Sequence, residues 1–297
     1  MQKQKVTLEF VVKSNQVNAL TDLAKNLSIL GEYSLNFKVE EVFQPQRYIS
    51  LPGEFCTPKN YNGIHPDISF ADSRLAVSPE VLKAAKELKL QVSNNDQGFI
   101  GNLTFDQTEK LYNKLKTQGL FFLSPWYFNR ALNRLNEGIR GRREVKYEDG
   151  EPVTKERLIE IKSDIMEIRD PWRAIWLWAR FLSENGKLTI AHPIVQKNEE
   201  IKIVTEDLDK DTLMVDKIQG IDLRDWVSNG YTSQGLVKNT IKEGRDSSWY
   251  PRNGHVPRFN ADSGGVGFLC GGGPSDSGSS LGIWPARIFH RKRRLKK

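Results

Sequence analysis

The residues best suited to metal chemistry are three aspartates in the run EDLDKDTLMVDKI. Asp207, Asp209 and Asp211 alternate along the chain, as the first three ligands of an EF-hand calcium loop do. The pattern then fails, because Thr212 stands where the loop needs its turn glycine and Ile218 where it needs its closing glutamate. We therefore expect an acidic turn between strands and no metal site. A domain stabilised by calcium is kept as an alternative.

Histidine and cysteine, which often act in catalysis, show no catalytic spacing here. The four histidines stand far apart, at positions 65, 192, 255 and 290, and none of their intervals is that of a zinc site. Cys56 and Cys270 are too few for a disulfide framework, and we expect both to be small buried hydrophobic residues. The run GVGFLC lacks the third glycine of a dinucleotide-binding loop. The sequence predicts no enzyme and no cofactor.

The net charge of +7 comes from 44 basic and 37 acidic residues. The last eleven residues, RIFHRKRRLKK, contain seven basic residues and no acidic one, so the rest of the chain is neutral as a whole. A broad phosphate-binding face is therefore not predicted, and nucleic acid is not the expected partner. We interpret residues 288–297 as a solvated basic tail. A nucleic-acid- or anion-binding module that uses this tail is the alternative.

Signals for membrane insertion or export are missing from the sequence. No apolar run approaches the length of about 18 residues that a membrane-spanning helix needs. The first residues, MQKQKVTLEFVVKSNQ, lack the apolar core and cleavage site of a signal peptide. The default expectation is a cytoplasmic protein without a membrane span, and export to the surface by another route stays open.

Residues 250–283 differ in composition from the rest of the chain. Nine of the 23 glycines fall in these 34 residues. The window contains no Lys, Glu, Gln, Met or Trp, although these five types number 67 in the chain and about eight would be expected in the window. Surface loops normally collect Lys, Glu and Gln, so a loop-rich composition does not explain why these residues are missing.

The same window alternates with the period of a β-strand. Because successive side chains of a strand point to opposite faces, we expect one set of residues to face a core and the other to form an outer surface. An inner face of uniformly small or apolar residues beneath an outer face of mixed residue types is typical of a binding surface. The inner set is Phe259, Ala261, Ser263, Val266, Phe268 and Cys270, and the outer set is Arg258, Asn260, Asp262, Gly267, Leu269 and Gly271.

The run WYPRNGHVPRFNADSGGVGFLCGGGPSDSGSSLGIWPAR resembles the variable region of diversity-generating retroelement proteins, with an archaeal member as the candidate nearest match. The run DLRDWVSNGYTSQGLVKN resembles the segment that precedes this region. In that family a reverse transcriptase misreads the adenines of a template. The template's AAC and AAT codons can become codons for Asn, Asp, Gly, Ser, Arg, His, Tyr, Leu or Cys, but never for Lys, Glu, Gln, Met or Trp. Those five types are the ones missing here.

The resemblance implies a C-type lectin fold, similar to that of formylglycine-generating enzymes, which displays the variable residues near its C-terminal end. It implies no catalysis, because those enzymes use paired cysteines near the C-terminus and Cys270 stands alone there. The variable, ligand-contacting positions implied are Arg252, Asn253, His255, Arg258, Asn260, Asp262, Gly265, Gly267, Leu269, Gly271, Gly272, Asp276 and Gly278. The scaffold positions implied are Trp249, Phe259, Ala261, Val266, Phe268, Cys270, Pro274, Leu281, Gly282 and Trp284.

The elements that must position this region begin with a small α/β part. Strand patterns cover residues 6–12, 33–42 and 68–77, a helical pattern covers residues 17–30, and another helix begins at Ser78. A βαββαβ, ferredoxin-like topology is one candidate for this part. Mainly helices are expected from residue 103 to about 184, with starts at Thr104, Ser124 and Asp170. The last of these is an apolar helix at about residues 172–182, and short strands with long turns follow it.

The sequence as a whole predicts an α+β protein in three parts. These are an N-terminal α/β region at residues 1–97, a C-type lectin-like display domain at residues 98–287, and the tail at residues 288–297. The predicted function is binding: adenine-directed mutagenesis would diversify residues 250–283 so that the surface recognises varied ligands. The ligand itself is unknown, and a protein is the expected class.

Overall fold

The computed structural model describes residues 6–13, 33–40, 46–57, 65–76, 78–94, 99–116, 119–167, 173–198 and 200–289. The chain forms two compact units, Met1–Pro45 and Gln46–Lys297. This division differs from the predicted boundary after residue 97. In the first unit β1 (Val6–Lys13) pairs in parallel with β2 (Tyr33–Glu40), which confirms two predicted strands. The helix predicted at residues 17–30 lies outside the described residues.

The ferredoxin-like candidate is wrong for the described strands. The strand predicted at residues 68–77 is shorter and joins a four-stranded sheet in the second unit, not the sheet of β1 and β2. Its neighbour along one edge is the last strand of the chain, with Ala286 opposite Phe70. The order of this sheet is β3 (Tyr48–Leu51), β4 (Ile68–Ala71), β17 (Pro285–Ile288) and β7 (Leu120–Phe122).

Three of the predicted helix starts are confirmed, and each has a side-chain cap. Ser78, Thr104 and Ser124 each accept a hydrogen bond from a backbone N–H three residues later, which satisfies a donor that the helix itself leaves free. Thr104 forms a full capping box with Gln107. The helices are α2 (Gly53–Cys56), α3 (Pro79–Glu87), α4 (Phe105–Leu115), α5 (Pro125–Ile139), α6 (Lys155–Met166) and α7 (Leu223–Ser228).

The apolar helix predicted at residues 172–182 is wrong. The chain forms β8 (Arg173–Trp176) and β9 (Arg180–Glu184) there instead. Ile175 packs in one core cluster, whereas Ala174 and Trp176 pack in a second one. A strand that is covered on both faces has a continuous apolar run, and such a run cannot be told from a buried helix by periodicity.

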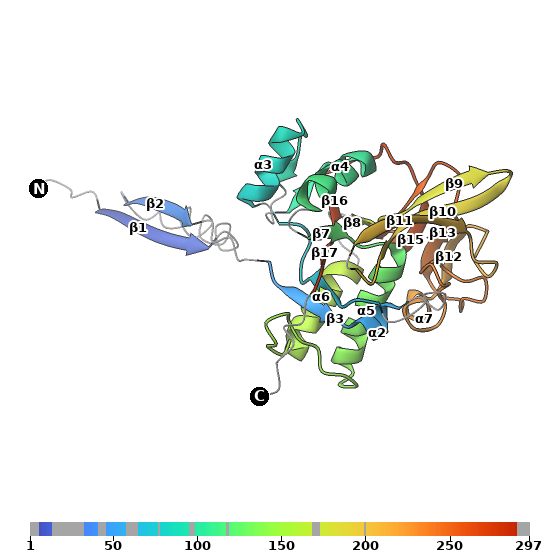
Figure 1. The fold of residues 1–297 in the computed structure, drawn as a ribbon. Helices are drawn as coiled ribbons and strands as arrows, with labels where there is room; N and C mark the ends of the chain where they lie inside the picture. The colour runs from blue at the N-terminus through green and yellow to red at the C-terminus, as the bar shows by residue number, and fades with distance from the viewer. Residues whose placement is uncertain are drawn as a thin grey trace, which may run out of the picture. The chain divides into compact units, whose positions relative to one another are not determined.

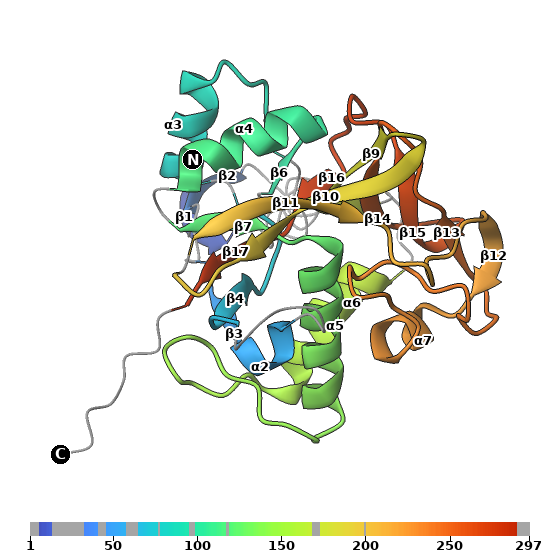
Figure 2. The same cartoon turned by 45° about the vertical axis from the view of Figure 1, so that its right-hand side comes forward.

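A six-stranded sheet and a three-stranded sheet complete the second unit (Figures 1 and 2). In Figure 2 the strands β12, β13, β15 and β14 lie at one side of this unit, while α3 and α4 lie near β16. The six-stranded order is β12 (Lys217–Ile221), β13 (Asp246–Trp249), β15 (Gly265–Gly272), β14 (Val256–Asp262), β8 and β16 (Leu281–Ile283). The other sheet contains β9, β10 (Lys187–Val195) and β11 (Ile201–Asp207), and β5 (Ser93–Asn94) pairs with β6 (Ile100–Gly101).

The α+β class predicted from the sequence is confirmed by these helices and sheets. Two hydrophobic clusters lie on opposite faces of the six-stranded sheet at β8. The larger cluster contains residues of α5, α6 and α7, and the smaller one contains residues of α3 and α4. Within the part of the chain that the structure describes, no helix is long and apolar enough to cross a membrane.

Candidate binding surface

The inner face of the β14–β15 hairpin is built from aromatic side chains. Phe259 is 1% exposed and Phe268 is fully buried. The Phe268 ring centroid lies 4.9 Å from that of Trp226 on α7, and the Phe259 centroid lies 5.2 Å from that of Phe128 on α5. Large aromatic side chains contribute much of the free energy of a core through the area they bury. These contacts fix the hairpin against the helices.

The outer face of the hairpin carries the positions that the retroelement resemblance implies are variable. The antiparallel register places Arg258 opposite Leu269, Asn260 opposite Gly267, and Asp262 opposite Gly265. Opposed residues of an antiparallel pair share one face of the sheet. The alternation read from the sequence therefore holds from Arg258 to Asp262 and from Gly265 to Leu269, and it brings the outer residues together in pairs. Ser263, which the sequence placed on the inner face, is instead exposed in the turn between the two strands.

Part of this outer face is covered. β14 also pairs with β8, so that Arg258 lies opposite Trp176 and Asn260 opposite Ala174. The helices α3 and α4 belong to the same core cluster as those two residues of β8. Asn260 and Leu269 are each only 7% exposed. Of the predicted contact positions, those that are buried are Asn260, Gly267, Leu269 and Gly272.

Two polar atoms on this face have no hydrogen-bond partner among the described residues. They are the buried Nε of Arg258 and Oδ1 of Asn260. Leaving a buried polar atom unpaired costs about 1–3 kcal/mol, and folded proteins rarely tolerate it. Arg258 is nevertheless paired through another nitrogen of its guanidinium, Nη1, which lies 3.1 Å from the Asp276 carboxylate.

Three predicted variable glycines differ in the room they leave for a side chain. A Cβ on Gly272 would lie 2.8 Å from the backbone oxygen of Val256, which cannot move without shifting the sheet. Gly265 has a φ of +127°, a conformation that other residues rarely adopt. A Cβ on Gly271 meets only side chains, and the nearest atom is the flexible end of Arg252 at 2.5 Å. The geometry favours variation at Gly271 and opposes it at Gly272 and Gly265.

The open part of the surface lies where β14 begins and β15 ends, and we call it the display patch. Arg258 forms an ion pair with Asp276 at 3.1 Å. Arg252 forms an ion pair with Asp216, and its guanidinium carbon lies 4.5 Å from the centre of the Tyr250 ring. Ion pairs this exposed contribute little to stability, so a ligand could rearrange them at low cost. The display patch is Arg252, Asn253, His255, Arg258, Gly271 and Asp276.

The three other predicted variable positions that are not buried, Asp262, Gly265 and Gly278, lie outside the display patch. Asp262 and Gly265 flank the turn at the other end of the hairpin. Seven strand residues at about 3.3 Å each separate the two ends by roughly 20 Å, so one small ligand cannot touch both. Gly278 is half-buried in the loop that precedes β16.

The loop at residues 273–280 is held through its backbone. The N–H of Phe105, at the start of α4, donates to the carbonyl oxygen of Pro274 at 3.0 Å, and the N–H of Asn102 donates to that of Gly278 at 2.8 Å. A Cβ on Gly101 would lie only 2.2 Å from the Ser279 carbonyl oxygen, so this close approach requires glycine. These contacts do not depend on side chains, so the loop keeps them when its residues change. One further contact does depend on a side chain, since the Asp276 carboxylate accepts the backbone N–H of Gly273 at 3.2 Å.

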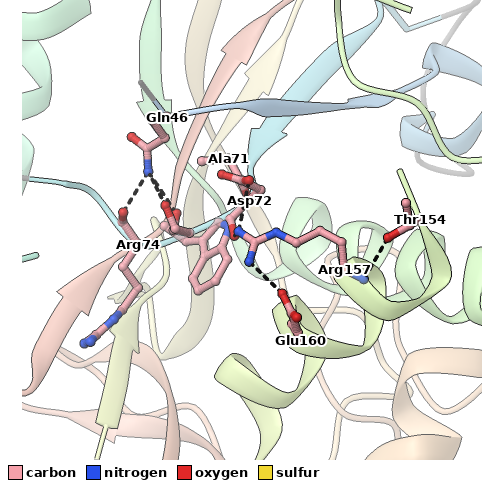
Figure 3. A network of polar contacts seen from close by, with 9 residues as sticks. Gln46, Ala71, Asp72, Arg74, Thr154, Arg157 and Glu160 are labelled. Carbon is pink, nitrogen blue, oxygen red and sulfur yellow. Dashed lines mark hydrogen bonds and ion pairs between the residues drawn. The ribbon is translucent and has the colours of Figure 1, made fainter. Parts of the chain in front are cut away.

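Trp284, which follows residues 250–283, is anchored to a segment far away in the sequence. Its indole N–H donates to the carbonyl oxygen of Ala71 at 2.7 Å. The Gln46 amide donates to the carbonyl oxygen of Arg74 at 2.7 Å, and Arg157 on α6 pairs with Asp72 at 3.0 Å (Figure 3). Residues 46–57 and 65–74 thus belong with this part of the fold, although the sequence assigned them to a separate N-terminal part.

The predicted scaffold positions are mostly buried. Trp249 and Pro274 are the two that are partly exposed. Cys270 is 2% exposed and Cys56 is fully buried, as expected of small hydrophobic residues, and burial raises the pKa of both thiols. The buried scaffold positions are Phe259, Ala261, Val266, Phe268, Cys270, Leu281, Gly282 and Trp284.

Asp209 and Asp211 lie in the turn between β11 and β12, as predicted, whereas Asp207 is the last residue of β11. Asp209 Oδ1 accepts the backbone N–H of Asp211 at 3.0 Å, and its Oδ2 accepts the hydroxyl of Ser233 at 3.1 Å. These backbone and side-chain hydrogen bonds lower the pKa of Asp209 and outweigh its partial burial, which acts to raise the pKa. Among the described residues no group of three His, Cys, Asp or Glu side chains could hold a metal ion.

One catalytic pattern was missed in reading the sequence. Residues 278–282 spell GSSLG, which fits the GxSxG pattern of a nucleophilic serine. That chemistry needs a sharp turn from a strand into a helix, whereas here a loop leads into the strand β16. The local structure around Ser280 therefore does not support a nucleophile.

Comparison with protein-family models finds no match, and searches of the curated proteins and of the solved structures find no similar chain. The geometry of the surface and the composition of residues 250–283 are therefore the observations on which a function can be argued.

Proposed function

We propose that this chain is a binding protein whose display patch is diversified by adenine-directed retroelement mutagenesis, and that its ligands are proteins. The observation that supports the proposal most directly is the division of the β14–β15 hairpin. Its inner residues are buried in an aromatic core, while the neighbouring loop is held by backbone hydrogen bonds. Side chains in the display patch can change without altering this aromatic core, and of the backbone contacts in the loop only the hydrogen bond from the Gly273 N–H to the Asp276 carboxylate, at 3.2 Å, would be lost with them.

The proposal includes the display domain. We propose that the helices and sheets from residue 98 to residue 287 form a C-type lectin-type domain, to which residues 46–97 add β3, β4 and α3. β4 pairs with β17 near the C-terminal end, and this pairing supports treating residues 46–97 and 98–287 as one unit.

The test at the gene level is to sequence this gene in many sister cells. We expect substitutions to concentrate in the codons of the display patch, and we expect a near-identical template beside a reverse-transcriptase gene. Substitutions that fall equally on Phe259, Ala261 and Pro274 would contradict the proposal.

The matching test at the protein level uses two libraries of variants. In the first, the six display-patch positions carry residues reachable from AAC and AAT codons. In the second, the same residues replace six buried scaffold positions. We expect most members of the first library to have thermal unfolding midpoints within a few degrees of the parent's, and most members of the second to fail to fold. If the two libraries contained equal fractions of unfolded variants, the division of the hairpin into a buried inner face and a tolerant outer surface would be contradicted.

A further inference from the structure

A small cleft opens where the first turn of α5 meets the turn after β11 and the loop between α7 and β13. Its volume is about 150 Å³. Every residue that lines it lies outside residues 250–283, so the cleft is separate from the display patch. The residues that matter for its chemistry are Trp126, Asp209, Asp211, Tyr231, Ser233 and Lys238.

Two unlike charges line this cleft without pairing with each other. The backbone of Asp211 is held, because its N–H donates to Asp209 Oδ1 at 3.0 Å and its carbonyl oxygen accepts the N–H of Asn239 at 2.8 Å. Lys238 lies on the neighbouring segment, opposite Thr212. Among the described residues, no cation lies within 4 Å of the Asp211 carboxylate and no carboxylate lies within 4 Å of the Lys238 ammonium. The cleft therefore has room for a ligand that bridges the two charges.

The wall beside Asp211 is fixed by hydrogen bonds of its own. Asp209 Oδ2 accepts the hydroxyl of Ser233 at 3.1 Å, and the N–H of Asp209 donates to Gln234 Oε1 at 3.0 Å. The Gln234 amide in turn donates to Glu206 Oε1 at 2.9 Å. Asp209 is thus occupied within the protein, and Asp211 is the carboxylate that remains for a ligand. A wall that is ordered before binding lowers the entropy cost of binding.

An aromatic pair with a buried cation behind it forms another wall. The ring centroids of Trp126 and Tyr231 lie 5.9 Å apart, and the guanidinium carbon of Arg130 lies 4.2 Å from the centre of the Tyr231 ring. Arg130 is only 8% exposed, and no carboxylate of the described residues lies within 4 Å of it. Arg130 and Lys238 together balance the two aspartates of the cleft. A ligand of zero net charge is therefore favoured over a cation or an anion.

We propose that this cleft binds a free α-amino acid, with the ligand's ammonium group on Asp211 and its carboxylate on Lys238. An α-amino acid carries both charges on one carbon atom, and its apolar part would lie against Trp126 and Tyr231. A few converging polar groups beside an aromatic wall are the usual makeup of a small-molecule site. The cleft is smaller than the roughly 300–1,000 Å³ of drug-sized sites, which favours the smallest amino acids.

The experiment is isothermal titration calorimetry of the full chain with five probes. Glycine and alanine carry both charges, methylamine carries the cation alone, acetate carries the anion alone, and calcium chloride tests a metal. The variants in the cleft are Asp211→Asn and Lys238→Gln. The matched controls are Glu87→Gln and Lys114→Gln, which remove one partner each from an ion pair of 2.7 Å between α3 and α4, away from the cleft.

We expect glycine to bind the parent with a dissociation constant of about 0.1–1 mM, because so small a ligand has few atoms in contact. Methylamine and acetate should bind at least about tenfold more weakly, since each satisfies one of the two charges. Asp211→Asn should weaken glycine about tenfold or more and leave acetate unchanged, whereas Lys238→Gln should weaken glycine and leave methylamine unchanged. Both controls should bind glycine within about twofold of the parent.

Thermal unfolding of the variants separates binding from folding. Asp211→Asn and Lys238→Gln should unfold within a few degrees of the parent, because neither side chain loses an ion pair within the described part of the chain. Failure of glycine and alanine to bind the parent at about 10 mM would overturn the proposal. So would methylamine or acetate binding as tightly as glycine, or an equal loss of glycine affinity in the controls.

A metal site is the other outcome that would overturn the amino-acid proposal. It would appear as calcium binding that Asp211→Asn removes, without any binding of glycine. None of these measurements depends on variation in residues 250–283. The cleft and the proposed function of the display patch can therefore fail independently.

Discussion

The two faces of the β14–β15 hairpin share one backbone but differ in what a substitution costs. On the inner face Phe259 and Phe268 contact the aromatic rings of α5 and α7, and every atom removed leaves a void. Beside the outer face, Arg252 in the segment before β14 and Asp276 in the loop after β15 take part in exposed ion pairs that solvent can replace. The comparison teaches that the residues of one hairpin and its flanking segments can differ widely in what they contribute to the fold, because alternation sends strand residues to opposite sides and the flanking segments leave the sheet.

The largest expected effect is the loss of an inner ring. Phe268→Ala should lower the free energy of unfolding by about 3–5 kcal/mol, since the site loses a fully buried aromatic side chain and collapses only partly. Asn253→Ala in the exposed loop is the matched control and should change it by less than about 0.5 kcal/mol. Urea denaturation measures both. Similar losses of unfolding free energy in the two variants would contradict the distinction between the buried inner face and the exposed surface.

The second prediction concerns two adjacent glycines, both of which the resemblance assigned to the variable, ligand-contacting positions. Gly272→Ala should cost about 1–3 kcal/mol of unfolding free energy, because its Cβ would press against the Val256 backbone oxygen. Gly271→Ala should be nearly neutral, because the flexible Arg252 side chain can move away. Thermal and urea unfolding of the pair tests this. If Gly272→Ala is the milder change, the boundary of the variable surface has been drawn in the wrong place.

The third prediction is that the core beneath the hairpin responds to acid. His65 is 1% exposed; its Nδ1 lies 2.7 Å from the carbonyl oxygen of Pro66, and its Nε2 lies 2.6 Å from the Tyr127 hydroxyl. Nδ1 must donate to that oxygen, so Nε2 accepts from Tyr127, which itself accepts the Val195 N–H at 2.9 Å. Burial lowers the pKa of His65, and protonation would break this chain of hydrogen bonds.

The direction of the pH effect follows from that shift. Above the unfolded-state pKa of about 6.5 the imidazole is neutral in both states, and His65 adds no pH dependence. Below it the unfolded chain binds the proton more readily than the folded one, so stability falls with pH until the lower, folded-state pKa is passed. Urea midpoints from pH 8 to pH 5 should show this fall in the parent and less of it in His65→Gln. An identical slope in both would rule His65 out as the cause.

The smallest expected effect is at the ion pair of Arg252 and Asp216. Arg252→Ala and Asp216→Ala should each change the free energy of unfolding by no more than about 1 kcal/mol, because both side chains are about one-third exposed. A double-mutant cycle gives the coupling energy directly. A coupling of several kcal/mol would mean that the outer face also holds the fold.

Local signals in the sequence were enough for several elements. Ser78, Thr104 and Ser124 cap helices where the sequence placed them, because a cap depends on residues within one turn. The alternation from Phe259 to Cys270 likewise appears as two paired strands. The segment at residues 172–182 was misread because β8 is buried on both faces, and that burial comes from elements remote in sequence.

The sequence by itself determined which residues of the hairpin share a face, since a strand has a fixed period of two. It also determined the unusual composition of residues 250–283. Only the tertiary structure decided which part of the outer face is open. Pairing with β8, whose Ala174 and Trp176 pack in the same cluster as α3 and α4, accompanies the burial of Asn260. Gly267, Leu269 and Gly272 on β15 are buried as well, whereas Arg252 is half-buried and Asp276 is exposed. The exposure of a strand residue depends on which elements pack over the strand. The period of two in the local sequence carries no information about those remote elements.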